Sequence, residues 1–220
     1  MKKLTFFSLL ALTTAATPAM AITASSGLYL GGGAGYGTPE LSKYIDSASA
    51  GAPSSAKIGG LAWSGFAGYN FALNDNWLVG LEVGYDTAGK AKYTYSDGTS
   101  EVNPSDVDAL LTATYLFNNG FNFFAKGGIA HAYQKSEVTG SEVAYDTLTR
   151  NRAIAKVGFG YLFDLGNAGS LNLYAQYAHL FGHYGQADST NLATDLISTD
   201  VAQVGLAYNF SLGGQDDGDD

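Results

Sequence analysis

Apolar side chains recur at every second position in eight segments of this chain, and this pattern restricts the possible folds more than any other feature. In the clearest segment, residues 77–86 (WLVGLEVGYD), large apolar residues occupy the odd positions and mostly glycine or acidic residues the even ones. Because successive side chains of a strand point to opposite faces, each segment predicts a β-strand with one apolar and one small or polar face. The eight segments are residues 27–37, 61–71, 77–86, 107–117, 121–133, 153–163, 171–180 and 201–210.

The connections between these segments alternate in length. They are expected to be short at residues 73–76, 118–120 and 164–169, and long at residues 38–60, 88–104, 136–150 and 183–198. Transmembrane β-barrels have this asymmetry, with short turns in the periplasm and long loops outside the cell. We therefore predict an all-β fold, an eight-stranded antiparallel transmembrane up-and-down β-barrel.

Aromatic residues gather beside the short connections and at the end of the last segment, on the apolar face. Amphipathic rings favour the boundary between lipid and water, where one end stays wet. This placement predicts an aromatic girdle at the periplasmic interface. Its residues are Tyr69, Phe71, Trp77, Tyr115, Phe117, Phe121, Phe123, Tyr161, Phe163, Tyr208 and Phe210.

The polar faces of three segments carry a charge near the middle of the segment. Glu82, Lys126 and Lys156 occupy these positions, and Gln176 stands where a second acidic residue is expected. In an eight-stranded barrel this face lines a lumen that side chains just fill. We predict that these four residues form a lumen charge cluster. The cluster is either a buried, hydrogen-bonded plug that fixes the barrel or a gate whose ion pairs exchange to open a narrow path.

The two ends of the chain differ in composition from the alternating part. Residues 1–21 have a basic start, a short apolar run and Ala19-Met20-Ala21, which is typical of a secretory signal peptide cleaved near Ala21. Residues 22–210 would form the barrel domain, and residues 211–220 an acidic tail. The tail's DDGDD lacks the spacing and the final glutamate of a calcium loop, so we expect a solvated tail.

Charge and hydropathy exclude several classes of protein. The formal net charge is −9, and removing Lys2 and Lys3 with the leader makes it −11, which argues against nucleic acid as a partner. After residue 21 no apolar run is long enough for a membrane-spanning helix. The chain has no cysteine, so no disulfide can stabilise it.

The glycine-rich stretch GLYLGGGAGYG, residues 27–37, superficially resembles a phosphate-binding loop. It contains no G-x-G-x-x-G, and Pro39 with a Ser-, Ala- and Gly-rich connection follows where a helix would be needed. We interpret the glycines as part of a strongly curved strand of a narrow barrel, where missing side chains admit bulky neighbours.

Four stretches taken in order resemble a known family: GLYLGGGAGYG, WLVGLEVGYD, FNFFAKGGIA and the closing VGLAYNF. They are similar to the opacity-type, outer membrane protein A-like β-barrels of Gram-negative bacteria. The resemblance spans about residues 27 to 210 and leaves no room for the periplasmic peptidoglycan-binding domain of larger relatives.

The resemblance also implies partners and an assembly signal. The family's closing strand, ending in phenylalanine, is recognised by the barrel assembly machinery, and here Tyr208 and Phe210 match it, although ten residues follow. Periplasmic chaperones, outer-membrane lipid and lipopolysaccharide are the other partners implied. The resemblance further implies that Glu82 and Lys126 pair inside the barrel.

No catalytic or metal-binding arrangement stands out. His131 and His179 fall on separate segments and His183 is four residues from His179, too far apart along a strand to converge on one metal ion. Neither His131 nor His179 starts the His-x-Ser found in lipid A deacylase barrels. We expect no catalytic residues, no cofactor and no metal.

Two functions remain open. One is a non-enzymatic barrel with a plugged lumen that contributes to envelope structure and contacts host or matrix ligands through its long loops, which carry Tyr44, Tyr93, Tyr95 and Tyr145. The other is a narrow porin for small solutes or ions. Glycines on the lumen face favour the porin, because missing side chains could leave a water path. The bulky lumen residues Tyr29, Phe66, Leu78 and Phe124 favour the plug.

Overall fold

The computed structural model describes residues 23–39, 55–57, 59–94, 99–139, 144–182 and 198–210. These residues form ten strands and one 3-10 helix, η2. The elements are β1 (Gly27–Pro39), β2 (Ser55–Lys57), β3 (Gly60–Ala72), β4 (Trp77–Thr87), β5 (Ala91–Thr94), β6 (Thr99–Leu116), β7 (Phe121–Thr139), β8 (Ala144–Asp164), η2 (Gly166–Ala168), β9 (Ser170–Leu180) and β10 (Thr199–Asn209).

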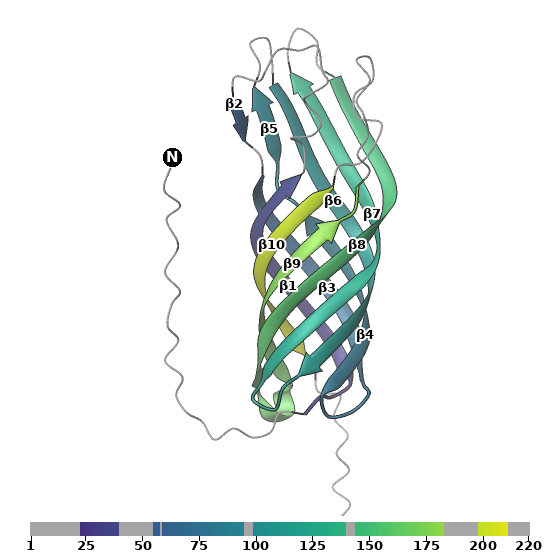
Figure 1. Cartoon of the computed structure of the whole chain (residues 1–220), viewed down its shortest axis with the longest axis vertical. Coiled ribbons are helices and arrows are strands. Elements are labelled where there is room, and N and C mark those ends of the chain that lie inside the picture. The colour runs from purple at the N-terminus through teal and green to yellow at the C-terminus, as the bar shows by residue number, and fades with distance from the viewer. Residues whose placement is uncertain are drawn as a thin grey trace, which may run out of the picture.

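Eight of the strands close into one antiparallel barrel (Figure 1). Neighbours in sequence pair with each other from β6 through β10, and β1 pairs with both β10 and β3. β4 joins β3 to β6, and the pairing of β6 with β7 completes the ring. The predicted eight-stranded barrel is therefore confirmed. Among the described residues no helix is long and apolar enough to cross a membrane.

The two faces of the strands are those that the alternation predicts. On β4, Leu81 and Val83 are 57% and 61% exposed on the outside, whereas Glu82 between them is 2% exposed. Outward-facing Leu30 on β1 and Val204 on β10 are also exposed. In a lipid bilayer these apolar side chains form the band that contacts the acyl chains.

The predicted long connections at residues 88–104 and 136–150 are wrong over much of their length. β6 begins at Thr99, β7 continues to Thr139, β8 begins at Ala144, and β5 with β2 extends the sheet beside β6. The prediction ended each strand where the outward apolar residues end. The last outward apolar residue of a strand marks the edge of the band that contacts lipid. The strands β6, β7 and β8 continue beyond this edge with polar residues on their outer face, and they extend further than the other strands of the barrel (Figure 1).

The short turns are positioned by side-chain hydrogen bonds at the opposite end of the barrel. Asn74 Oδ1 accepts from the backbone N–H groups of Asn76 and Trp77 at 3.0 and 2.9 Å. Asn119 and Asp164 accept from the backbone in the same way in the next two short turns. Asparagine and aspartate favour turns because their side chains can bond to the backbone two residues on. The three predicted short connections are confirmed.

The predicted girdle residues lie beside these turns and contact one another in pairs. The ring centroids of Trp77 and Tyr115, on adjacent strands, are 5.0 Å apart, and those of Phe121 and Tyr161 are 5.1 Å apart. Further pairs lie along single strands: Tyr69 with Phe71, Tyr115 with Phe117, Tyr161 with Phe163, and Tyr208 with Phe210. Phe123 is 53% exposed on the outer face.

The predicted signal peptide, residues 1–21, and the predicted acidic tail, residues 211–220, lie outside the described residues. Of the tyrosines expected in loops, Tyr44 and Tyr95 lie outside them as well, whereas Tyr93 belongs to β5 and Tyr145 to β8.

The outward face of β4 predicts how charge is tolerated at different depths. Replacing Leu81 with arginine at mid-strand should destabilise the barrel by about 2–4 kcal/mol, since the charge would enter the lipid band. Leu28 pairs in register with Tyr69 of the girdle, so Leu28→Arg should cost only about 0–1 kcal/mol. Reversible urea unfolding in lipid vesicles measures both, and equal costs would contradict this placement of the lipid band.

Candidate functional site

Glu82 and Lys126 form an ion pair inside the barrel. They project from β4 and β7, which lie on either side of β6, and Lys126 Nζ donates to Glu82 Oε2 at 2.6 Å. The Tyr29 hydroxyl donates to the same oxygen at 2.9 Å. The Glu82 side chain is fully buried and that of Lys126 is 10% exposed. Both charges are thus neutralised away from bulk water.

Aromatic rings pack against this ion pair at the same level of the lumen. The Lys126 ammonium lies 4.6 Å from the centre of the Phe66 ring and 5.2 Å from that of Phe124, both within cation–π distance. Tyr174 contacts Phe66 and Phe124, with ring centroids 5.9 and 6.1 Å apart, and Tyr29 contacts Phe66 at 6.1 Å. We call Tyr29, Phe66, Phe124 and Tyr174 the aromatic plug.

Lumen glycines make room for the aromatic plug. A Cβ atom on Gly158 would lie 2.4 Å from the Phe124 ring, and one on Gly205 would lie 2.4 Å from the Tyr174 hydroxyl. A Cβ on Gly31 would lie 2.6 Å from the Phe66 ring. At these three positions a ring occupies the space that the missing side chain leaves.

A second group of charges surrounds Lys156. Its ammonium donates to Asp86 Oδ2 at 2.5 Å and lies 2.6 Å from Asp108 Oδ2. Lys156 projects from β8, whereas Asp108 is on β6 and Asp86 on β4. These contacts therefore link β8 to two strands with which it does not pair. Lys156 and Asp108 are each 2% exposed.

Asp106 completes a cluster of three carboxylates at this level. It is 6% exposed, and its register partner on β4 is Asp86. Ligand oxygens of Asp86, Asp106 and Asp108 all lie within 4.8 Å of one another. The charge cluster predicted from sequence included none of these three aspartates. Their shared parity with Glu82 on β4, and with one another on β6, was the available signal.

Gln176 takes a different place from the one expected. It is buried in the lumen beside Gln203, its register partner on β10. Its buried Oε1 accepts no hydrogen bond from the described residues. Gln203 instead exchanges hydrogen bonds with Ser64 at 2.9 and 3.1 Å. The structure therefore brings Glu82 together with Lys126, and Lys156 with two aspartates, while Gln176 contacts neither ion pair.

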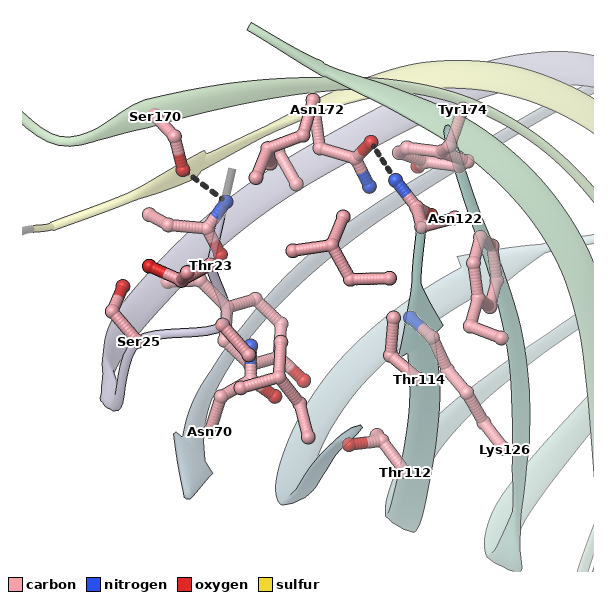
Figure 2. A pocket seen from close by; sticks show the side chains of 18 of the residues that line it. Thr23, Ser25, Asn70, Thr112, Thr114, Asn122, Lys126, Ser170, Asn172 and Tyr174 are labelled. Carbon is pink, nitrogen blue, oxygen red and sulfur yellow. Dashed lines mark hydrogen bonds between the residues drawn. The ribbon is translucent and has the colours of Figure 1, made fainter. Parts of the chain in front are cut away.

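A polar cavity of about 80 Å³ lies on the periplasmic side of the aromatic plug. Asn122, Asn172, Thr112 and Thr114 line it, and Asn122 donates to Asn172 at 2.9 Å (Figure 2). Thr23 and Ser25, from the segment before β1, also line the cavity (Figure 2). Lys126 and the four plug rings bound it as well, so the cavity ends at the plug.

His131 and His179 lie on the outer surface, apart from the lumen groups. His131 Nδ1 is 2.6 Å from Asn151 Oδ1, and its ring packs edge-on against Tyr133. His179 Nδ1 lies 2.7 Å from Asp200, which also accepts from the Tyr177 hydroxyl. Neither arrangement places a serine or threonine hydroxyl against a histidine base, which a hydroxyl nucleophile would need. His183 lies outside the described residues.

The fold and its filled lumen define a small transmembrane β-barrel of the outer-membrane type. The family described as outer membrane protein beta-barrel domain matches residues 7–210 of the chain. The chain belongs to this family, which places it in the outer membrane.

Several solved structures are similar to this barrel. Ail from Yersinia pestis, in complex with the heparin analogue sucrose octasulfate, has 11% identity and a TM-score of 0.46 and covers 84% of this chain and 97% of its own. Neisserial surface protein A has 11% identity and a TM-score of 0.44, with 85% and 100% covered. OprG from Pseudomonas aeruginosa has 14% identity and a TM-score of 0.40, with 86% and 97% covered. A comparison with curated protein sequences finds no match.

The glycines that accommodate the plug predict a size limit. Gly158→Ala should destabilise the barrel by about 1–3 kcal/mol, because the added methyl group overlaps the Phe124 ring and the adjacent backbone. Gly65→Ala is the matched control, since nothing lies within 4 Å of its Cβ position. Thermal unfolding in detergent compares them, and equal stability of the two variants would contradict the close packing of the plug.

The buried ion pair predicts a large cost when one partner is removed. Lys126→Met leaves the buried Glu82 carboxylate without its cation and should cost about 3–5 kcal/mol. The exposed pair of Lys90 with Glu101, 2.7 Å apart, is the control, and Lys90→Met should cost about 0–1 kcal/mol. Urea unfolding of both variants measures the difference, and a Lys126→Met cost as small as the control would show that the pair is solvated.

Proposed function

We propose that this protein is a non-enzymatic outer-membrane barrel with a closed lumen. It contributes to envelope structure and takes part in surface interaction, as an adhesin, through its extracellular end. The observation that carries the proposal is that Lys126 bonds to Glu82 and packs on Phe66 and Phe124 at one level of the lumen. These groups line the cavity on the periplasmic side, which supports a closed lumen.

The extracellular end offers a surface built from strands as well as loops. β5, β6, β7 and β8 continue beyond the apolar band, and their outer face carries polar and charged side chains. Lys92, Glu101 and Glu137 are consecutive register partners across this extension. A paired sheet holds such groups at fixed spacing, which suits recognition of a polar surface on a host cell or matrix.

A narrow porin is the second candidate, and the polar cavity favours it. If Lys126 left Glu82, the amide- and hydroxyl-lined space on the periplasmic side would extend further into the lumen. Lys156 already bonds to two different carboxylates, so an exchange of ion-pair partners is chemically simple.

Conductance in a planar bilayer separates the two candidates. The wild-type barrel should give no discrete steps, and the double variant Lys126→Ala with Phe124→Ala should give steps because it removes two groups that close the lumen. Discrete steps from the wild type that Glu82→Ala alters would instead support the narrow porin.

Adherence to host cells or matrix tests the surface role. Lys135 and Thr147 are register partners on β7 and β8, so replacing residues 136–146 with Asn-Gly shortens this hairpin while keeping its register. Bacteria that display the wild type should adhere more strongly than bacteria that display the shortened barrel at equal surface level. Equal adherence would exclude this hairpin as the binding surface.

A further inference from the structure

We propose that Asp86, Asp106 and Asp108 bind one hard divalent cation, such as Ca²⁺, inside the barrel toward its extracellular end. This site is separate from the Glu82–Lys126 pair and does not depend on whether the barrel adheres or conducts.

Carboxylates outnumber ammonium groups around Lys156. Its ammonium contacts Asp86 and Asp108, and ligand oxygens of Asp86, Asp106 and Asp108 all lie within 4.8 Å of one another. Three carboxylates therefore lie close together beside one lysine. Buried carboxylates this close repel one another, so a divalent cation between them would stabilise the arrangement.

Asp106 is a buried carboxylate with an unpartnered oxygen. It is 6% exposed, and its Oδ1 has no hydrogen-bond partner among the described residues. Among the described ion pairs, Lys156 contacts Asp86 and Asp108 but not Asp106. Asp108 Oδ1 also has no hydrogen-bond partner among the described residues. Two such oxygens in one cluster of carboxylates are arranged to bind a cation.

The spacing of the three aspartates fits one calcium ion. Ca²⁺ binds oxygen ligands at about 2.3–2.6 Å, so two ligands on opposite sides of the ion are about 4.6–5.2 Å apart. The three aspartate oxygens all lie within 4.8 Å of one another, which one ion can span. Lys156 contacts Oδ2 of Asp86 and of Asp108, and Asp108 Oδ1 has no hydrogen-bond partner among the described residues, so this oxygen is available to the ion. Water would complete the coordination.

A proton bound to Asp106 would also reduce the negative charge of the cluster. The variant Asp106→Asn distinguishes a bound proton from a bound divalent cation. Asp106→Asn keeps the size of the side chain but removes one negative charge and one ligand. Without divalent cations this variant should unfold at a higher temperature than the wild type, because the wild type then retains an unpaired buried charge. With Ca²⁺ the order should reverse, since only the wild type gains a bound ion. A proton alone predicts no effect of Ca²⁺ on either protein.

The experiment uses the full barrel in lipid nanodiscs, first in EDTA and then with increasing CaCl₂. Calorimetric titration and thermal unfolding are recorded for the wild type, Asp106→Asn and the control Glu137→Gln, whose carboxylate is exposed on the outer face of β7. We expect the Ca²⁺ affinity of Asp106→Asn to fall at least tenfold and that of Glu137→Gln to stay unchanged. Asp106→Ser serves as a second variant if Asp106→Asn does not fold.

Three results would overturn the proposal. They are a wild type whose unfolding temperature does not respond to Ca²⁺, an Asp106 variant that keeps the full response, and a control that loses as much affinity as the Asp106 variant. The wild-type response is measured without any substitution, so the first result is decisive even if both Asp106 variants fail to fold.

Discussion

Closure of the sheet is the constraint on which the remaining structure depends. Within a bilayer each backbone N–H and C=O must be bonded inside the protein, and a barrel achieves this only when its first and last strands pair. Here β1 pairs with β10 and β6 with β7, so the ring of eight strands has no open edge within the membrane. A ring of this size leaves an interior that side chains must fill. Inward-facing charged side chains must therefore be paired inside the lumen, and inward-facing aromatic rings must be packed there.

The interior meets both demands by pairing unlike groups. Lys126 contacts a carboxylate on one side and aromatic rings on the other, which couples the ion pair to the plug. Glycines on facing strands provide the space for those rings. Lys156 links β8 to β4 and β6 through Asp86 and Asp108, whereas Asp106 is left without a basic partner in the described residues. The carboxylate cluster around Asp106 is therefore the candidate cation site.

Much of the fold could be predicted from sequence because lipid and lumen impose opposite demands on alternate residues. The alternation around Leu81 and Glu82 therefore predicted correctly which residues of β4 face the lipid and which face the lumen. The three short turns were predicted from the few residues between consecutive alternating segments. The strand ends could not be predicted in the same way. Beyond Val107 the outward residues of β6 are polar, so the strand continues without the apolar signal that located it.

The lumen was only partly predictable for a related reason. Parity shows which residues face inward but not which of them meet across the barrel, because that depends on strand tilt and side-chain reach. Gln176 was expected in the charge cluster, yet Asp86 and Asp108 from other strands reach Lys156. The lumen glycines were ambiguous for the same reason, since sequence alone does not show whether a ring or water fills the space.

We propose that paired charges packed against aromatic rings close the lumen. ¹⁵N NMR of the lysine ammonium groups in lipid nanodiscs tests it most directly, because ammonium protons exposed to water exchange too fast to be seen. The account predicts slowly exchanging ammonium signals for Lys126 and Lys156, which Lys126→Met and Lys156→Met would assign, and none for the exposed Lys90. Rapid exchange at Lys126 would show that water passes the plug and would contradict the closed lumen.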